Sequence, residues 1–162
     1  STTMTLVPQV ADAVSIPVIA AGGIADGRGF AAARMLGAQA VQVGTRFVVS
    51  KECVVHPRYK QQILRAKDID SVVTGRSGGH PVRALRNKMS REYLRREQAG
   101  CEFEELESLT VGALRKAVVD GDVDYGTLMA GQIAGMIQEE KSCREIIEGM
   151  MDEAESLMNR AW

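Results

Sequence analysis

The chain has 162 residues, of which 45% are hydrophobic and 25% are charged, a composition typical of a soluble globular protein. Its formal net charge is −1, so the overall charge gives no reason to expect nucleic acid or an anionic membrane as a partner. No apolar stretch reaches the ~20 residues of a membrane-spanning helix, and the N-terminus lacks the pattern of a signal peptide. The three cysteines are widely spaced without a CxxC motif, which favours reduced thiols in the cytoplasm over disulfides or a zinc site.

The first third of the chain predicts a strand–helix–strand unit. A short helix over residues 5–14 precedes the first strand at 17–21, a second helix covers 27–36, and the second strand covers 40–43. Gly37 is a good residue to end the second helix. The first strand is apolar throughout and both strands have apolar residues on both faces, as in a covered parallel sheet, and the crossover between them should be right-handed.

No further strand is expected after Phe47. Residues 56–100 are polar, basic and rich in turn signals, and helices are expected over 110–119 and 125–140. Two parallel strands cannot protect their own outer edges, so we expect this chain to be the last part of a larger α/β fold. By itself it should lack enzymatic activity.

A last helix is predicted from the pair Ser142 and Glu145, whose spacing is that of a capping box. The helix carries an apolar stripe that should face the core. The residues of this stripe are Ile146, Ile147, Met150, Met151, Leu157 and Met158.

Each predicted strand ends in a glycine step, Gly22-Gly23 after the first and Gly44-Thr45 after the second. Glycine lets the backbone approach a ligand closely, and N–H groups at such turns and at helix N-termini bind anions. Two such turns on neighbouring strands predict a phosphate site, as at the last strands of β/α barrels. The motif at 27–32 also matches GxGxxA, but it comes several residues after the strand, which argues against a Rossmann site.

The motifs PVIAAGGIADGRG and GAQAVQVGTRF resemble the flavin-binding half of the superfamily that contains nitronate monooxygenase and enoyl-acyl-carrier-protein reductase II. Two further motifs, TGRSGGHPVRALRNKMSREYLRRE and YGTLMAGQIAGMI, resemble the reductase II branch. The resemblance covers nearly the whole chain. It implies the C-terminal part of a TIM-type (β/α)8 barrel that binds FMN, with a helical and loop insertion after the last strand.

On this reading the chain divides into three segments. Residues 1–55 would be the last strands and helices of the barrel, and 124–162 helices that return to the barrel. The polar, turn-rich make-up of residues 56–123 indicates an excursion from the barrel, an inserted lid on the substrate side. The FMN phosphate would meet residues of both turns, and a glutamine would lie near the flavin. These cofactor-binding residues are Ala21, Gly22, Gly23, Gln42, Gly44, Thr45 and Gln132.

The implied activity is reduction of an enoyl-acyl-carrier-protein by NADH or NADPH through FMN, in bacterial fatty-acid synthesis. The implied partners are the acyl carrier protein thioester and the upstream half of the same enzyme, and a homodimer is one option. No catalytic residue is assigned in this chain, because the active-site histidine of the family should precede Ser1. The alternatives are a nitronate monooxygenase, or an inactive fragment that binds FMN or phosphate.

The remaining polar residues give weaker signals. His56 is expected in a turn, whereas the loop around His80 could line a substrate or nicotinamide pocket; the pair gives no metal signal. Residues 76–96 contain seven Lys or Arg and one Glu. We expect a solvated helix face, with an acidic carrier protein or a pyrophosphate as the alternative ligand.

Overall fold

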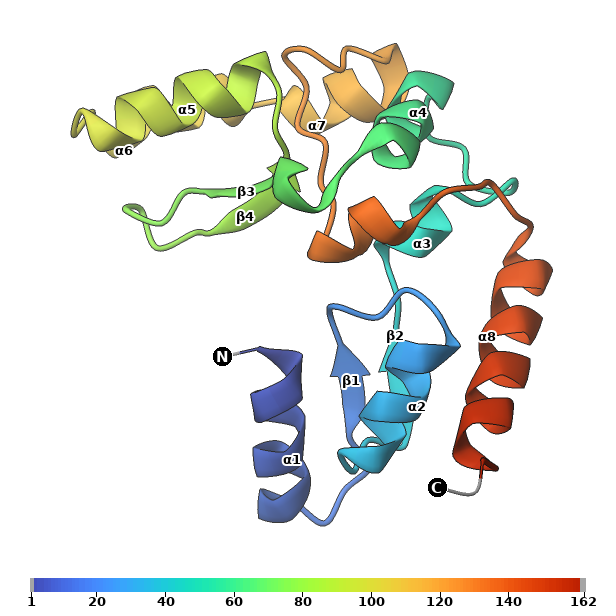
Figure 1. Ribbon diagram of the computed structural model, residues 1–162. Helices are drawn as coiled ribbons and strands as arrows, with labels where there is room; N and C mark the ends of the chain where they lie inside the picture. Colours follow the sequence, from blue (N-terminus) through green and yellow to red (C-terminus); the bar gives the residue numbers. More distant parts are fainter. Residues whose placement is uncertain (1, 161–162) are drawn as a thin grey trace. The chain divides into compact units, whose positions relative to one another are not determined.

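The computed structural model describes residues 2–160, which form two compact units (Figure 1). The first unit contains residues up to 52 together with the C-terminal segment from 140, and the second contains residues 53–139. Residues 124–139 therefore fold within the second unit. The roles predicted for segments 1–55, 56–123 and 124–162 stay predictions.

The first unit contains the predicted strand–helix–strand arrangement. Its two strands pair in parallel, with Ile19 opposite Ala40 and Ala21 opposite Gln42. The α/β class is thereby confirmed, and the barrel stays a prediction. The elements of this unit are α1 (Thr3–Ala13), β1 (Ile19–Ala21), α2 (Gly27–Met35), β2 (Ala40–Gln42), α3 (Thr45–Val48) and α8 (Cys143–Met158).

Helix α2 is the element around which the first unit packs. On one side it contributes Ala33 to an apolar cluster that also contains Val7, Ala20 of β1, Ile24 and Ala38. On the other side it packs against α8 so closely that a Cβ on Gly27 would lie 2.6 Å from the Met150 carbonyl oxygen. After the helix, Gly37 takes a φ of +100°, the left-handed conformation predicted for its end.

The second unit contains strands where the sequence predicted none. β3 (Ser71–Thr74) and β4 (Val82–Leu85) form an antiparallel hairpin. Each strand has only four residues within a basic, turn-rich segment, so the β-branched run at 72–74 was too short to indicate it. The helical elements of this unit are α4 (Pro57–Arg65), η1 (Asp68–Asp70), α5 (Lys88–Gln98), α6 (Phe103–Thr110), α7 (Ala113–Arg115), η2 (Lys116–Asp120) and η3 (Gln132–Met136).

The expected helix over 125–140 is wrong. Apart from η3, a 3₁₀ turn, this segment is irregular. Its small residues serve close packing: a Cβ on Gly126 would lie 2.4 Å from the Asp122 carbonyl oxygen, and one on Gly135 would lie 2.8 Å from the Asp68 nitrogen. Glycine is needed there for contact with other backbone segments, and it disfavours a helix.

The expected helix over 110–119 is also only partly present. Helix α6 ends at Thr110, and Gly112 follows in the left-handed conformation with a φ of +71°. The chain then resumes as α7, which continues into η2, a single π-helical stretch. Gly112 therefore interrupts the helix that the sequence pattern predicts.

The last helix begins where the capping box predicts. The Ser142 hydroxyl accepts the Glu145 N–H at 3.2 Å, and a Glu145 carboxylate oxygen accepts the Ser142 N–H at 2.7 Å. The predicted apolar stripe is only partly correct, because Ile146 and Met150 are buried whereas Ile147, Met151 and Met158 are 53%, 50% and 41% exposed. One edge of the stripe meets α2, and within the described residues the other edge faces solvent.

The capping box gives a test of pH dependence. Hydrogen bonds from Ser142, followed by Lys51, lower the pKa of Glu145 from 4.5 to about 2. A lowered folded-state pKa means that the stabilisation is fully present above the ordinary pKa and is lost as pH falls towards 2. We therefore expect Glu145→Gln to lower the melting temperature slightly at pH 7, and the gap to the wild type to close between about pH 4.5 and 2.

The matched control is Glu148→Gln. Glu148 lies on the same helix but outside the cap, and its exposed ion pair with Arg144 is long, at 3.8 Å. Its melting temperature should follow the wild type across the same pH range. A Glu145→Gln gap that stays constant down to pH 2 would contradict the role of the carboxylate charge in the cap.

Candidate functional site

The two predicted glycine turns begin side by side. Because β1 and β2 are parallel and Ala21 pairs with Gln42, the turns leave neighbouring strands at the same edge. Ala21 and Gln42 are both exposed, as are the glycines that follow them. The structure thus brings six of the seven predicted cofactor-binding residues to one open edge, and their role in binding FMN stays a prediction.

The first turn requires glycine at both of its positions. Gly22 has a φ of +94° and Gly23 a φ of +77°, which residues with a Cβ rarely adopt. The consecutive left-handed residues reverse the chain directly after β1. The turn therefore presents backbone, with no side chain, at the edge of the strand pair.

Thr3 holds this turn in place and was not predicted from the sequence. Its hydroxyl lies 2.7 Å from the Gly22 carbonyl oxygen and 3.5 Å from that of Ala21, and it donates a hydrogen bond to them. Thr3 belongs to the first turn of α1, so this bond fixes the glycine turn to a helix. The two partners are 19 residues apart, and no local pattern could have indicated the contact.

The second turn is open at its glycine. Gly44 precedes α3 as its N-cap residue, and no side chain caps the helix there. A Cβ built on Gly44 would meet nothing within 4 Å, and its φ of −105° is accessible to any residue. Thr45 follows as the first residue of α3 and is half-buried.

The N-terminus of α2 is already occupied by carboxylates. Asp26 accepts N–H groups from Arg28 at 3.0 Å and Gly29 at 3.3 Å, and Glu153 of α8 accepts the Gly27 N–H at 2.8 Å. Burial raises the pKa of Asp26, but the bonds from Arg28 and Gly29 outweigh it and the net shift is downward. The first N–H groups of α2 are therefore bonded to protein carboxylates, and the same contacts argue against a Rossmann site at this helix end.

The remaining residues for which the sequence predicts a role lie in the second unit. Gln132 is the first residue of η3 and is exposed, and its predicted place near the flavin stays a prediction. His56 caps α4, its Nδ1 accepting the Arg58 N–H at 3.1 Å, as expected for a turn histidine. Among the described residues, no group of histidine, cysteine and acidic side chains could hold a metal ion.

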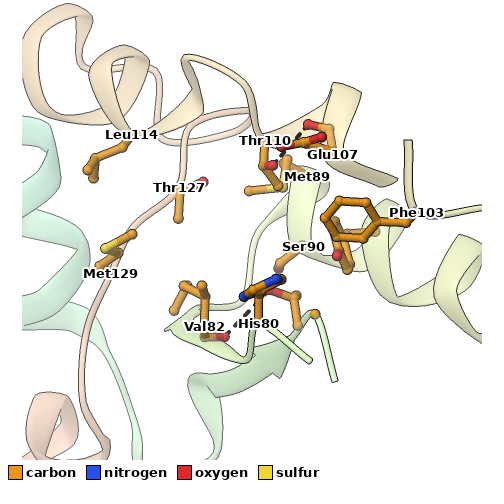
Figure 2. A pocket seen from close by; sticks show the side chains of 14 residues that line it. His80, Val82, Met89, Ser90, Phe103, Glu107, Thr110, Leu114, Thr127 and Met129 are labelled. Carbon is orange, nitrogen blue, oxygen red and sulfur yellow. Dashed lines mark hydrogen bonds between the residues drawn. The ribbon is translucent and has the colours of Figure 1, made fainter. Parts of the chain in front are cut away.

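The second unit contains a pocket of about 580 Å³ between the β3–β4 hairpin, α5, α6 and the irregular segment at 127–129 (Figure 2). Ala84 of β4 forms an isolated bridge with Met129, which joins the hairpin to that segment. The Tyr59 hydroxyl donates to the Met129 carbonyl oxygen at 2.7 Å, and burial raises the pKa of Tyr59 to about 12. The wall of the pocket at Met129 is therefore fixed from behind.

His80 and Phe103 form the opposite side of the pocket (Figure 2). Their ring centroids are 6.1 Å apart, and a Cβ on Gly78 would lie 2.7 Å from the Phe103 ring. The hairpin tip thus rests directly on α6. The His80 loop lines a pocket, as one reading of the sequence expected.

Four of the seven basic residues at 76–96 lie on α5, in part the solvated helix face that was the first expectation, whereas Arg76, Arg83 and Arg86 lie in or beside the β3–β4 hairpin. Glu92 accepts bonds from Arg95 and Arg96, which lower its pKa to about 2. Lys88 pairs with Asp124 at 3.0 Å. These basic groups are already neutralised in part by their neighbours.

The sequence matches the family model of nitronate monooxygenase over residues 1–153. In structure, the chain is similar to FabK from Thermotoga maritima, with a TM-score of 0.91 and 51% identity, covering 97% of this chain and 50% of that one. A nitroalkane oxidase from Streptomyces ansochromogenes gives a TM-score of 0.80 and 30% identity, covering 96% of this chain and 44% of that one.

A probable nitronate monooxygenase of Staphylococcus saprophyticus is 36% identical over 158 residues, which are 98% of this chain and 44% of that protein. The chain therefore spans about half the length of the relatives it matches, as the sequence resemblance implied. Among residues 2–160, none of the helices combines the length and the hydrophobicity of a membrane span. By the extent of the family match and the fold that it shares with these relatives, the chain belongs to the nitronate monooxygenase family.

Proposed function

We propose that the protein containing this chain is an FMN-dependent enoyl-acyl-carrier-protein reductase that uses a nicotinamide cofactor. The observation that carries the proposal is the 51% identity to FabK, an enoyl-acyl-carrier-protein reductase II, over 97% of the chain. The similar proteins named for nitronate or nitroalkane oxidation reach 30% to 39% identity over 80% or more of the chain.

The structure offers a fit for the FMN phosphate at the two glycine turns. No Cβ stands over the first turn, and the space at Gly44 is open for 4 Å around the position that a Cβ would take. Phosphate groups bind where backbone N–H groups are accessible without side chains in the way. Because carboxylates fill the α2 N-terminus, the turns and the start of α3 would carry this contact.

The residues at the edge of the β1–β2 pair would contribute to FMN binding in different ways. Gly22 and Gly23 admit the phosphate closely, Thr3 keeps their turn in position, and Gly44 leaves room on the second strand. The Thr45 hydroxyl would add a donor, and Gln132 would lie near the flavin. FMN, when bound, supplies the redox chemistry, while the protein binds and orients it.

The proton donor for the enoyl substrate is proposed to lie outside this chain, because neither histidine here matches the family's active-site motif. The acyl carrier protein and the upstream half of the enzyme are the proposed partners, and the cytoplasm is the proposed location.

Nitronate monooxygenase activity is the second candidate, because the family model and several curated relatives carry that name. It would use the same FMN site and differ in the substrate and the electron acceptor. Nothing among the glycine turns distinguishes the two activities.

The first prediction separates these candidates. Full-length, FMN-loaded protein should oxidise NADH or NADPH in the presence of a trans-2-enoyl thioester and yield the saturated thioester. Oxygen uptake with an alkyl nitronate should be slower per unit of enzyme. Product analysis by mass spectrometry and an oxygen electrode would measure both, and rapid nitronate oxidation without enoyl turnover would replace the proposal by its rival.

The second prediction concerns Gly44. Gly44→Val should leave the fold intact, because its Cβ meets no protein atom within 4 Å, yet it should occupy the phosphate path. We expect FMN affinity to fall about 10-fold or more, the loss of one charge-assisted hydrogen bond. Flavin fluorescence titration of the full-length protein measures this affinity.

Gly149→Val is the matched control, since a Cβ on Gly149 in α8 also meets nothing within 4 Å. It should bind FMN like the wild type. Equal FMN affinity in the wild type and both variants would show that the phosphate lies elsewhere.

The third prediction concerns Thr3. Thr3→Val preserves the shape of the side chain but removes the hydroxyl that donates to the Gly22 carbonyl oxygen. FMN affinity should fall about 3- to 10-fold, in proportion to one hydrogen bond. Thr3→Ser restores the donor and should restore the affinity, so a serine variant as weak as the valine variant would refute the positioning role.

A further inference from the structure

The pocket of the second unit contains hydroxyl groups with no partner in the described part of the chain. Tyr93 is 5% exposed and Thr127 is 8% exposed, and both line the pocket. Neither side-chain hydroxyl makes a hydrogen bond to another described residue. Every fully enclosed side-chain oxygen or nitrogen in the described residues has a partner, so the hydroxyls of Tyr93 and Thr127 are accessible to solvent or to a ligand.

The neighbouring hydroxyls behave differently. Ser90 exchanges hydrogen bonds with Asn87, and Thr110 donates to the Glu107 carbonyl oxygen at 2.9 Å. Tyr93 and Thr127 therefore stand out as buried groups whose bonding capacity is left for a ligand. Burial, and then the nearby Glu97, raises the pKa of Tyr93, which keeps its hydroxyl protonated as a donor.

The walls around these hydroxyls are apolar. Phe103, Leu114 and Met129 are 41%, 41% and 42% exposed, high values for large apolar side chains that line a pocket. Figure 2 shows Leu114 and Met129 on one side of the pocket and Phe103 on the other. An apolar chain lying between them would remove this surface from water.

The charge of the pocket selects among ligands. Its lining contains no lysine or arginine, and its acidic residue is Glu107. A nicotinamide pyrophosphate would bring negative charge to a lining without lysine or arginine, the residues that usually recognise phosphate. A neutral ligand with an apolar chain and a hydrogen-bond acceptor suits the lining better.

We propose that this pocket binds the acyl chain of the thioester substrate, with the Tyr93 and Thr127 hydroxyls donating to a carbonyl or amide oxygen of the ligand. The lining of the pocket favours a neutral ligand that has an apolar chain and a hydrogen-bond acceptor. The identification of this ligand as the acyl group of the substrate rests on the proposed function. The His80 loop would then serve the acyl substrate rather than the nicotinamide.

The first experiment locates the ligand directly. Full-length protein labelled with ¹³C at the methionine methyl groups is titrated with decanoyl-N-acetylcysteamine, a neutral saturated thioester. The Met89 and Met129 methyl signals should shift, because both side chains line the pocket, whereas those of Met4 and Met35 in the first unit should not. NADH should leave the Met89 and Met129 signals unchanged.

The second experiment tests the hydroxyls and the apolar walls. Tyr93→Phe and Thr127→Val should each weaken binding of this probe about 3- to 10-fold, the effect of one hydrogen bond. Tyr125→Phe removes an exposed hydroxyl outside the pocket and is the matched control. From hexanoyl to decanoyl, affinity should rise about 4-fold for each added methylene group.

The outcomes separate this inference from the proposed function. Shifts of Met89 and Met129 with the thioester in a protein that lacks enoyl reduction would support the pocket and refute the enzymatic proposal. Enoyl reduction with unchanged methyl signals, and with unaltered affinity in Tyr93→Phe and Thr127→Val, would overturn the pocket inference alone. Movement of the same signals by NADH would overturn it in favour of a nicotinamide site.

Discussion

The parallel pairing of β1 with β2 is the constraint on which the candidate cofactor site depends. Its register places Ala21 opposite Gln42, so that two turns separated by about one helix in the sequence open at the same edge. A shift of this register would separate the turns along the strands. The pairing is fixed by the apolar cluster that includes Ala20 and Ala33, since small side chains let α2 lie close to the strands.

The two compact units present surfaces of opposite chemistry. The edge of the first unit is bare backbone at glycines, suited to an anion, and the neighbouring helix end is closed to anions by Asp26 and Glu153. The pocket of the second unit is largely apolar with isolated hydroxyls, and its lining contains no lysine or arginine. In the two proposals, the phosphate of the cofactor therefore binds to the first unit and the apolar chain of the substrate binds to the second.

Glycine has three different roles in this protein, and two of them belong to the proposed cofactor site. Gly22 and Gly23 provide left-handed backbone at a strand end. Gly27 and Gly126 instead allow segments to pack at distances that a Cβ would forbid. Gly44 does neither, because its φ is ordinary and its surroundings are empty, which leaves room for a ligand as the explanation for glycine there.

The sequence by itself determined the elements whose signals are local: the strand–helix–strand unit, the end of α2 at Gly37 and the capping box of Ser142 and Glu145. It also identified the family, through motifs that span most of the chain. Tertiary structure alone decided the β3–β4 hairpin and the irregular path of 125–140, because short strands and packing glycines are stabilised by distant partners. The Thr3 contact and the free hydroxyls of Tyr93 and Thr127 were likewise invisible in the sequence, since whether a polar group finds a partner depends on what the fold brings beside it.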